Sequence, residues 1–111
     1  MKKYKYIVFS NAAGDKDDAF NAWYDDIHLP EVLAVPGFTG AERYRNPALD
    51  GAPPEHKYLA IYDIETDTIG ATLDELMRRA GNGEMRMSDT LDMETVSTVL
   101  YEVITPHRRA K

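Results

Sequence analysis

The sequence contains no cysteine among its 111 residues. Without a thiol the chain has no disulfide, no thiolate nucleophile and no Cys-ligated zinc or iron–sulfur site. It also lacks any apolar run near the roughly 18 residues that a membrane-spanning helix needs. The first six residues alternate between polar and apolar types, which is unlike a signal peptide. We therefore expect a cytoplasmic protein.

Positive charge is also scarce, because 13 Lys and Arg residues stand against 19 Asp and Glu residues, a net charge of -6. Nucleic acids and anionic lipids are bound mainly through Lys and Arg. A basic group closes the sequence at residues 107–111, but such runs are typical of solvated termini. We expect neither a nucleic-acid nor a membrane partner.

The length is close to the common size of one domain. Hydrophobic residues make up 43% of the chain and charged residues 29%, which is ordinary for a globular protein. No internal repeat or low-complexity segment interrupts the sequence. We predict that residues 1–111 form a single domain.

Four stretches rich in Tyr, Ile, Val and Phe predict strands at 4–11, 38–45, 57–64 and 96–105. Asp15 is placed to cap a first helix, which we expect to end or kink at Pro30, with at most one irregular turn over residues 31–34. Thr66 or Asp67 is placed to cap a second helix that ends at Gly81. Residues 84–94 are expected to form a loop with at most one helical turn.

The predicted order is βαββαβ, the pattern of ferredoxin-like α+β folds, with a four-stranded antiparallel sheet and two helices on one face. The predicted strands carry apolar side chains on both faces, for example Tyr4 and Tyr6 against Ile7 and Phe9 in the first strand. Two helices cover only one face, so the other face requires a partner. We expect a homodimer in which two sheets pack together; a face thinly covered by loops is the alternative.

His28 is the leading candidate for chemistry. On a helical wheel it lies at the border of an apolar stripe that includes Phe20, Trp23 and Tyr24. An imidazole beside a crevice titrates near neutral pH and suits acid/base catalysis. The alternative is a purely structural role, in which His28 caps the helix end or hydrogen-bonds a backbone carbonyl.

Between residues 20 and 44 the chain carries Phe20, Trp23-Tyr24, His28, Pro30, Pro36-Gly37-Phe38 and Arg43-Tyr44. This spacing resembles that of EthD-like proteins, in which a helix-borne Trp-Tyr and His precede a Pro-Gly turn and the second strand. The resemblance implies a dimeric α/β barrel with a small-molecule pocket between helices and sheet. It also implies that His28 is an acid/base or ligand-orienting residue and that Trp23 and Tyr24 are pocket walls.

Seven tyrosines are many for this length. A tyrosine offers an aromatic surface with one hydroxyl, which suits either an aromatic ligand or a packed core. The predicted substrate-binding residues are aromatic side chains of the first helix and of the strands: Trp23, Tyr24, Tyr6, Tyr44, Tyr58 and Tyr62.

The function we predict is a cofactor-independent enzyme of the cyclase, isomerase, lyase or monooxygenase type, acting on a hydrophobic or aromatic molecule. The alternative is a non-catalytic binding or carrier protein that uses the same pocket. Asp25, His28 and Glu31 share helical spacing, but Pro30 interrupts it and no second histidine is placed to help, so no metal is expected. No cofactor is expected either, since the second helix has no His, Tyr or Cys to ligate haem.

Overall fold

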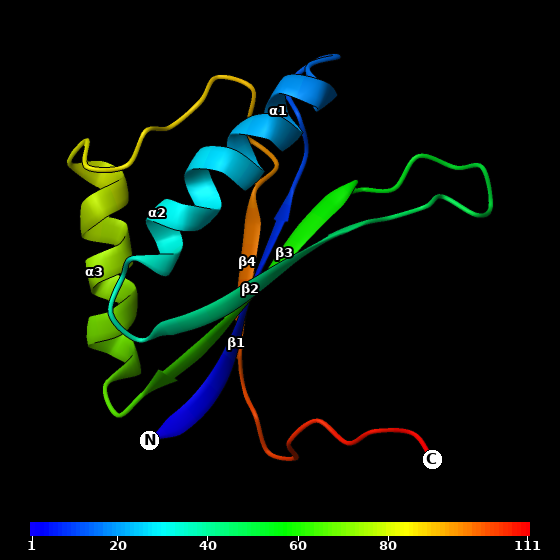
Figure 1. Cartoon of the computed structure of the whole chain (residues 1–111). Coiled ribbons are helices and arrows are strands. Elements are labelled where there is room, and N and C mark those ends of the chain that lie inside the picture. The colour runs from blue at the N-terminus through cyan, green and yellow to red at the C-terminus, as the bar shows by residue number, and fades with distance from the viewer.

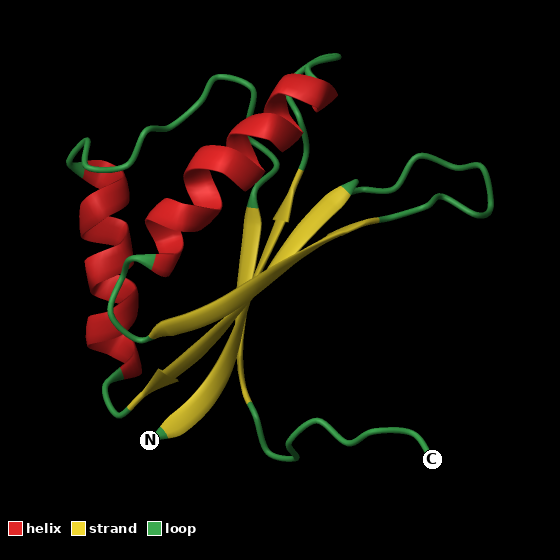
Figure 2. Ribbon diagram, in the orientation of Figure 1, coloured by secondary structure: helices red, strands yellow, loops and turns green.

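The computed structural model describes residues 1–111. Figure 1 shows the elements in colour order along the chain, and Figure 2 shows them by type. In sequence order the elements are β1 (Lys2–Ser10), α1 (Asp17–Trp23), η1 (Tyr24–His28), α2 (Leu29–Leu33), β2 (Phe38–Arg45), β3 (Tyr58–Thr66), α3 (Ile69–Gly81) and β4 (Ser97–Glu102).

The four strands form one sheet in the order β2-β3-β1-β4, and every neighbouring pair is antiparallel. The α1–η1–α2 segment and α3 both lie on one side of this sheet (Figure 1). This is the ferredoxin-like arrangement, so the predicted α+β fold class is confirmed.

The core lies between the helices and the sheet. In β3 every second residue is buried, which points Tyr58, Ala60, Tyr62 and Ile64 toward the helices. They pack against buried side chains of β1, of the helices and of the segment after α3: Tyr4, Tyr6, Phe20, Trp23, Tyr24, Val32, Val35, Leu76 and Met85. Aromatic rings dominate this core, and they account for its large buried area in a short chain.

The opposite face of the sheet carries no helix (Figure 1). The strand register places Ile7 between Ile61 and Val99, and Phe9 beside Leu59, on this face. Val99 and Tyr101, which follow the same alternation in β4, are 36% and 62% exposed. We call these apolar residues the open face of the sheet.

We expected the regular helix to end or kink at Pro30; the structure has an irregular turn just before this proline, but the chain stays helical beyond it. It continues to Leu33 through the π-helical turn η1. Proline has no N–H for the helix ladder, and its ring crowds the carbonyl four residues earlier. A wider π turn just before Pro30 absorbs that conflict, so the chain stays helical while shifting its side chains around the axis. Val35-Pro36-Gly37 then ends the helix, and Gly37 has φ 99°.

The capping predictions were wrong in detail. Lys16, not Asp15, occupies the N-cap of α1, and Thr68 occupies that of α3. Neither side chain forms a capping hydrogen bond with the backbone of its helix. Thr66 contributes differently, because its hydroxyl accepts hydrogen bonds from the Thr68 N–H (3.1 Å) and the Thr72 hydroxyl (2.9 Å). That local network fixes the turn into α3.

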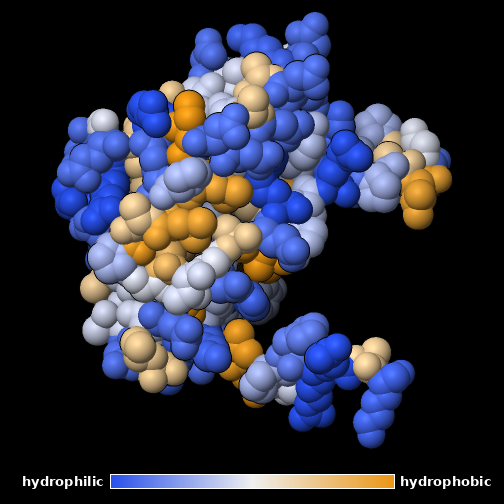
Figure 3. All heavy atoms as spheres, in the orientation of Figure 1, coloured by the Kyte–Doolittle hydropathy of each residue, from blue (hydrophilic) through white to orange (hydrophobic).

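In the C-terminal quarter β4 is shorter than predicted. Residues 84–94 form the expected loop, with a single bridge between Ala12 and Leu91. In the space-filling view hydrophobic atoms gather over α2, whereas the C-terminal tail is mostly hydrophilic (Figure 3). None of the helices combines the length and the apolar character that crossing a membrane demands.

Candidate functional site

A cavity of about 160 Å³ lies between the sheet and the two helices. Thirteen of its sixteen lining residues are hydrophobic. They come from β1, α2, β3, α3 and the segment after α3, and include Tyr6, Val8, Val32, Leu76, Ala80, Met85, Met87, Leu91 and Met93. Concave, mostly apolar sites with a few polar groups are typical of small-molecule binding.

The π turn places His28 on this cavity. Its ring stacks on Trp23 at 4.7 Å with an interplanar angle of 23°, and it meets the edge of Tyr24 at 4.9 Å and 86°. The Nδ1 atom is buried and has no hydrogen-bond partner in the protein. A buried polar atom without a partner is rare in folded proteins, and it points to a ligand or to a catalytic use.

The surroundings of His28 lower its pKa from 6.5 to about 4. Burial is the main cause, because it penalises the charged imidazolium. The Glu31 carboxylate opposes this effect and the Arg43 guanidinium adds to it. At neutral pH the ring is therefore uncharged, and one of its nitrogens is an acceptor.

Two tyrosines form a second polar point on the cavity wall. The hydroxyls of Tyr24 and Tyr62 are 2.8 Å apart and hydrogen-bonded to each other. Burial raises the pKa of both hydroxyls above the usual value of 10. Both tyrosines therefore stay protonated at any ordinary pH.

Arg43 holds Tyr24 from the far side. Its guanidinium lies 4.3 Å from the Tyr24 ring centroid and donates hydrogen bonds to Asn21 (2.8 Å) and Asp25 (2.9 Å). Such a cation–π contact fixes the ring and brings a positive charge close to it. Sequence reasoning missed this role. The available clue was strand alternation, which puts Arg43 on the helix side of β2, opposite Ala60.

The segment after α3 closes one wall of the cavity, and a single residue anchors it to the helix that bears His28. The Trp23 indole N–H donates to the Arg86 carbonyl at 2.7 Å, and Glu31 accepts from the Arg86 backbone N–H at 3.0 Å. This segment contributes Met85, Met87 and Met93 to the lining. Their thioethers are flexible and polarizable, so they form an adaptable wall.

The predicted site residues divide into two groups. His28, Tyr24, Tyr6 and Tyr62 all line the cavity. Trp23 does not line the cavity; its ring stacks on the His28 ring.

Two predicted tyrosines lie away from the cavity. Tyr44 points to the open face of the sheet, is 41% exposed and hydrogen-bonds Glu42. The Tyr58 hydroxyl donates to Asp17 at 2.6 Å, and this bond lowers the pKa of the Asp17 carboxyl. Strand alternation puts Tyr44 on the opposite face of the sheet, whereas Tyr58 shares a face with Tyr62 but lies four residues earlier along β3.

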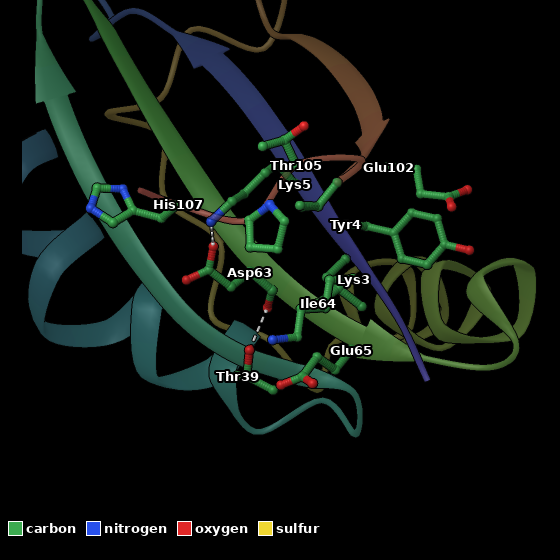
Figure 4. A pocket seen from close by; sticks show the side chains of 12 residues that line it. Lys3, Tyr4, Lys5, Thr39, Asp63, Ile64, Glu65, Glu102, Thr105 and His107 are labelled. Carbon is green, nitrogen blue, oxygen red and sulfur yellow. Dashed lines mark hydrogen bonds and ion pairs between the residues drawn. The ribbon is translucent and has the colours of Figure 1, made fainter. Parts of the chain in front are cut away.

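A larger hollow of about 580 Å³ lies beside the C-terminal tail (Figure 4). Only three of its twelve lining residues are hydrophobic, and the Lys5–Asp63 ion pair crosses it near His107. Its lining is mostly polar, and it contains no buried polar atom without a hydrogen-bond partner. The smaller cavity at His28 is therefore the candidate site.

Asp25, His28 and Glu31 do not form a metal site. Asp25 binds Arg43, and Glu31 binds Arg86. No group of three His, Asp or Glu side chains is arranged to hold a metal ion.

The fold and this cavity define a ferredoxin-like α+β protein with an internal apolar site. The sequence matches no protein-family model and no curated protein. Many solved structures are similar, and three of them are described below. An EthD family protein from Bacillus halodurans has TM-score 0.52 at 13% identity, covering 94% of this chain and 100% of that one.

A dimeric ferredoxin-like protein of unknown function from Jannaschia has TM-score 0.55 at 17% identity, with 91% and 99% covered. The haem degrader MhuD from Mycobacterium tuberculosis has TM-score 0.62 at 16% identity, with 95% and 99% covered. These likenesses show that the chain has the ferredoxin-like fold found in EthD-type proteins. At such low identity they show the fold alone.

Proposed function

We propose that this protein binds a small, hydrophobic or aromatic molecule in the cavity beside His28 and acts on it as a cofactor-independent enzyme. The observation that carries the proposal is the buried, unpartnered Nδ1 of His28 on a cavity whose lining is otherwise almost entirely apolar. A ligand with one polar group would satisfy that atom and fill the rest of the space.

The volume suits one aromatic ring. An apolar cavity of about 150 Å³ binds benzene, and the site has about 160 Å³. The methionine side chains in the wall allow somewhat larger ring systems, because they repack at low cost. Aromatic rings also make favourable contacts with thioether sulfur.

Haem is too large for this site. It has to be considered because one of the similar structures is a haem degrader. Drug-sized ligands already occupy pockets of roughly 300–1,000 Å³, and the cavity here has about 160 Å³. We therefore derive no step through haem.

His28 would act as the acid/base group. Its neutral ring accepts a proton from a bound ligand through one nitrogen, while the stacked Trp23 and the edge of Tyr24 hold the ring in place. Glu31, which favours the imidazolium, would help to stabilise the proton after transfer.

A binding or carrier protein is the second candidate. The pKa of His28, about 4, favours a binding role over catalysis, because an imidazole with so low a pKa is a weak base at pH 7. In that case His28 only accepts a hydrogen bond from the ligand. Release of a bound compound unchanged after long incubation would favour this candidate over catalysis.

The proposal includes a homodimer. The open face carries Ile7, Phe9, Leu59, Ile61 and Val99 side by side, and neither helix covers it. A second copy of the same face is the simplest cover, since two sheets pack well face to face. One of the similar structures is described as a dimeric ferredoxin-like protein, which supports this expectation.

Filling the cavity tests the binding site. Ala80 lines the cavity, whereas Ala71 on the same helix is exposed. We expect Ala80→Trp to weaken the binding of toluene at least about tenfold in a calorimetric titration, and Ala71→Trp to leave it unchanged. Equal binding by both variants, or none by the unmodified protein, would contradict the proposal.

A further inference from the structure

The Tyr24–Tyr62 pair leaves one hydroxyl proton without a protein acceptor. The two side chains are 2% and 1% exposed, and their hydroxyls bond only to each other, at 2.8 Å. Two hydroxyls carry two protons, and a single hydrogen bond between them uses one. A buried donor without an acceptor costs free energy, so its presence calls for a ligand.

This donor shares its cavity with the unpartnered Nδ1 of His28. Tyr24, Tyr62 and His28 all line the same space, and most of the remaining lining is aliphatic or thioether in character. Tyr24 joins the two points, because its hydroxyl bonds Tyr62 while its ring edge meets the imidazole at 4.9 Å. A ligand in this cavity would therefore contact all three side chains.

The local charge favours an electron-rich oxygen at the tyrosine pair. The Arg43 guanidinium lies 4.3 Å from the Tyr24 ring, and it is the positive charge closest to that ring. Burial raises the pKa of both hydroxyls, so they remain neutral donors and do not compete as anions. Hydroxyl donors on an apolar wall stabilise negative charge that develops on a ligand oxygen, and the Arg43 guanidinium, although it is paired with Asp25, lies on the same tyrosine ring.

We propose that the Tyr24–Tyr62 hydroxyl pair binds the oxygen of a phenol or an enol, and that such hydroxylated aromatic or conjugated compounds are the substrate class. The ligand oxygen accepts the free tyrosine O–H, and the ligand hydroxyl donates to the neutral His28. This assignment rests on the proposed function, since it needs the same cavity to hold a ligand.

A purely structural pair is the competing explanation. In that case the hydrogen bond only ties η1 to β3 across the core. Removing one hydroxyl would then change stability, but it would not change how the protein ranks two ligands of the same shape. The ratio of two affinities therefore separates the explanations.

Phenol and toluene are the probes, because a methyl group replaces the hydroxyl with little change of shape. We expect the ratio of phenol affinity to toluene affinity to fall about tenfold in the double variant Tyr24→Phe/Tyr62→Phe, since no hydroxyl donor is then left at this point of the cavity. Each single variant keeps one O–H donor but loses the hydrogen bond that polarises it, so we expect a smaller fall there, and the single variants serve if the double variant fails to fold. Tyr58→Phe is the matched control, because that hydroxyl bonds Asp17 away from the cavity.

The outcomes are distinct. Toluene binding in every protein, with the same affinity ratio in the cavity-tyrosine variants, the double variant included, and in the control, would overturn this inference and leave the cavity as a binding site. Failure of the unmodified protein to bind either compound would refute the proposed function and this inference together. A drop in the ratio confined to the two cavity tyrosines supports the inference.

Discussion

Between pH 7 and pH 4 the free energy of unfolding should fall by about 3 kcal/mol more in the unmodified protein than in His28→Gln. The pKa of His28 is lowered from 6.5 to about 4 in the folded chain. Each unit by which the pKa differs between the folded and the unfolded chain corresponds to about 1.4 kcal/mol of stability. Urea denaturation at a series of pH values measures the effect.

The sign follows from which state binds the proton first. As the pH falls below 6.5, the unfolded chain protonates His28 while the buried ring resists, so stability is lost through this window and levels off below about 4. Burial is the main cause; of the facing charged groups, Glu31 reduces the effect and Arg43 increases it.

The variant isolates this contribution. All other ionisable groups are the same in both proteins, so the difference between the two stability curves belongs to His28. Parallel curves between pH 7 and pH 4 would mean that the ring is accessible to protons, and they would remove the case for a buried, neutral His28. A titration of the ring by NMR would give the same pKa independently.

Ile7→Glu should dissociate the homodimer. Ile7 lies at the centre of the open face, between Ile61 and Val99 in the strand register. A carboxylate there would be desolvated without a partner if two faces packed together, so we expect dimerisation to weaken about 100-fold or more. Sedimentation velocity over a range of protein concentrations measures the change.

Ala19→Glu is the control, because it adds the same charge at an exposed position of α1. It should leave the dimer unchanged. A single copy of the unmodified protein at all concentrations, or a dimer that tolerates Ile7→Glu, would contradict the assembly through the open face.

The strand order and the fold were predictable from local patterns. Alternation in the tyrosine-rich strands and helical spacing in the two amphipathic segments define six elements, and few topologies accommodate six elements in that order. The second strand has the predicted bounds, 38–45. The first helix was harder, because the effect of Pro30 depends on packing that a sequence does not show. Burial of Trp23 and Tyr24 holds the chain helical where proline alone would end it.

The site was predictable only in part. His28 and Tyr24 were predicted from their position beside an apolar stripe. The Tyr24–Tyr62 pair joins residues 38 apart in the sequence, and its formation depends on strand register and on the π turn. The place of Arg43 among aromatic rings depends on the same long-range packing.

The most direct test of the account is to find where a small aromatic molecule binds. Methyl resonances can be followed by NMR while toluene is added. We predict shifts for Met85, Leu91 and Val8, which line the cavity, and none for Ile7 and Ile61 on the open face. Shifts confined to the open face, or absent everywhere, would contradict a binding site beside His28.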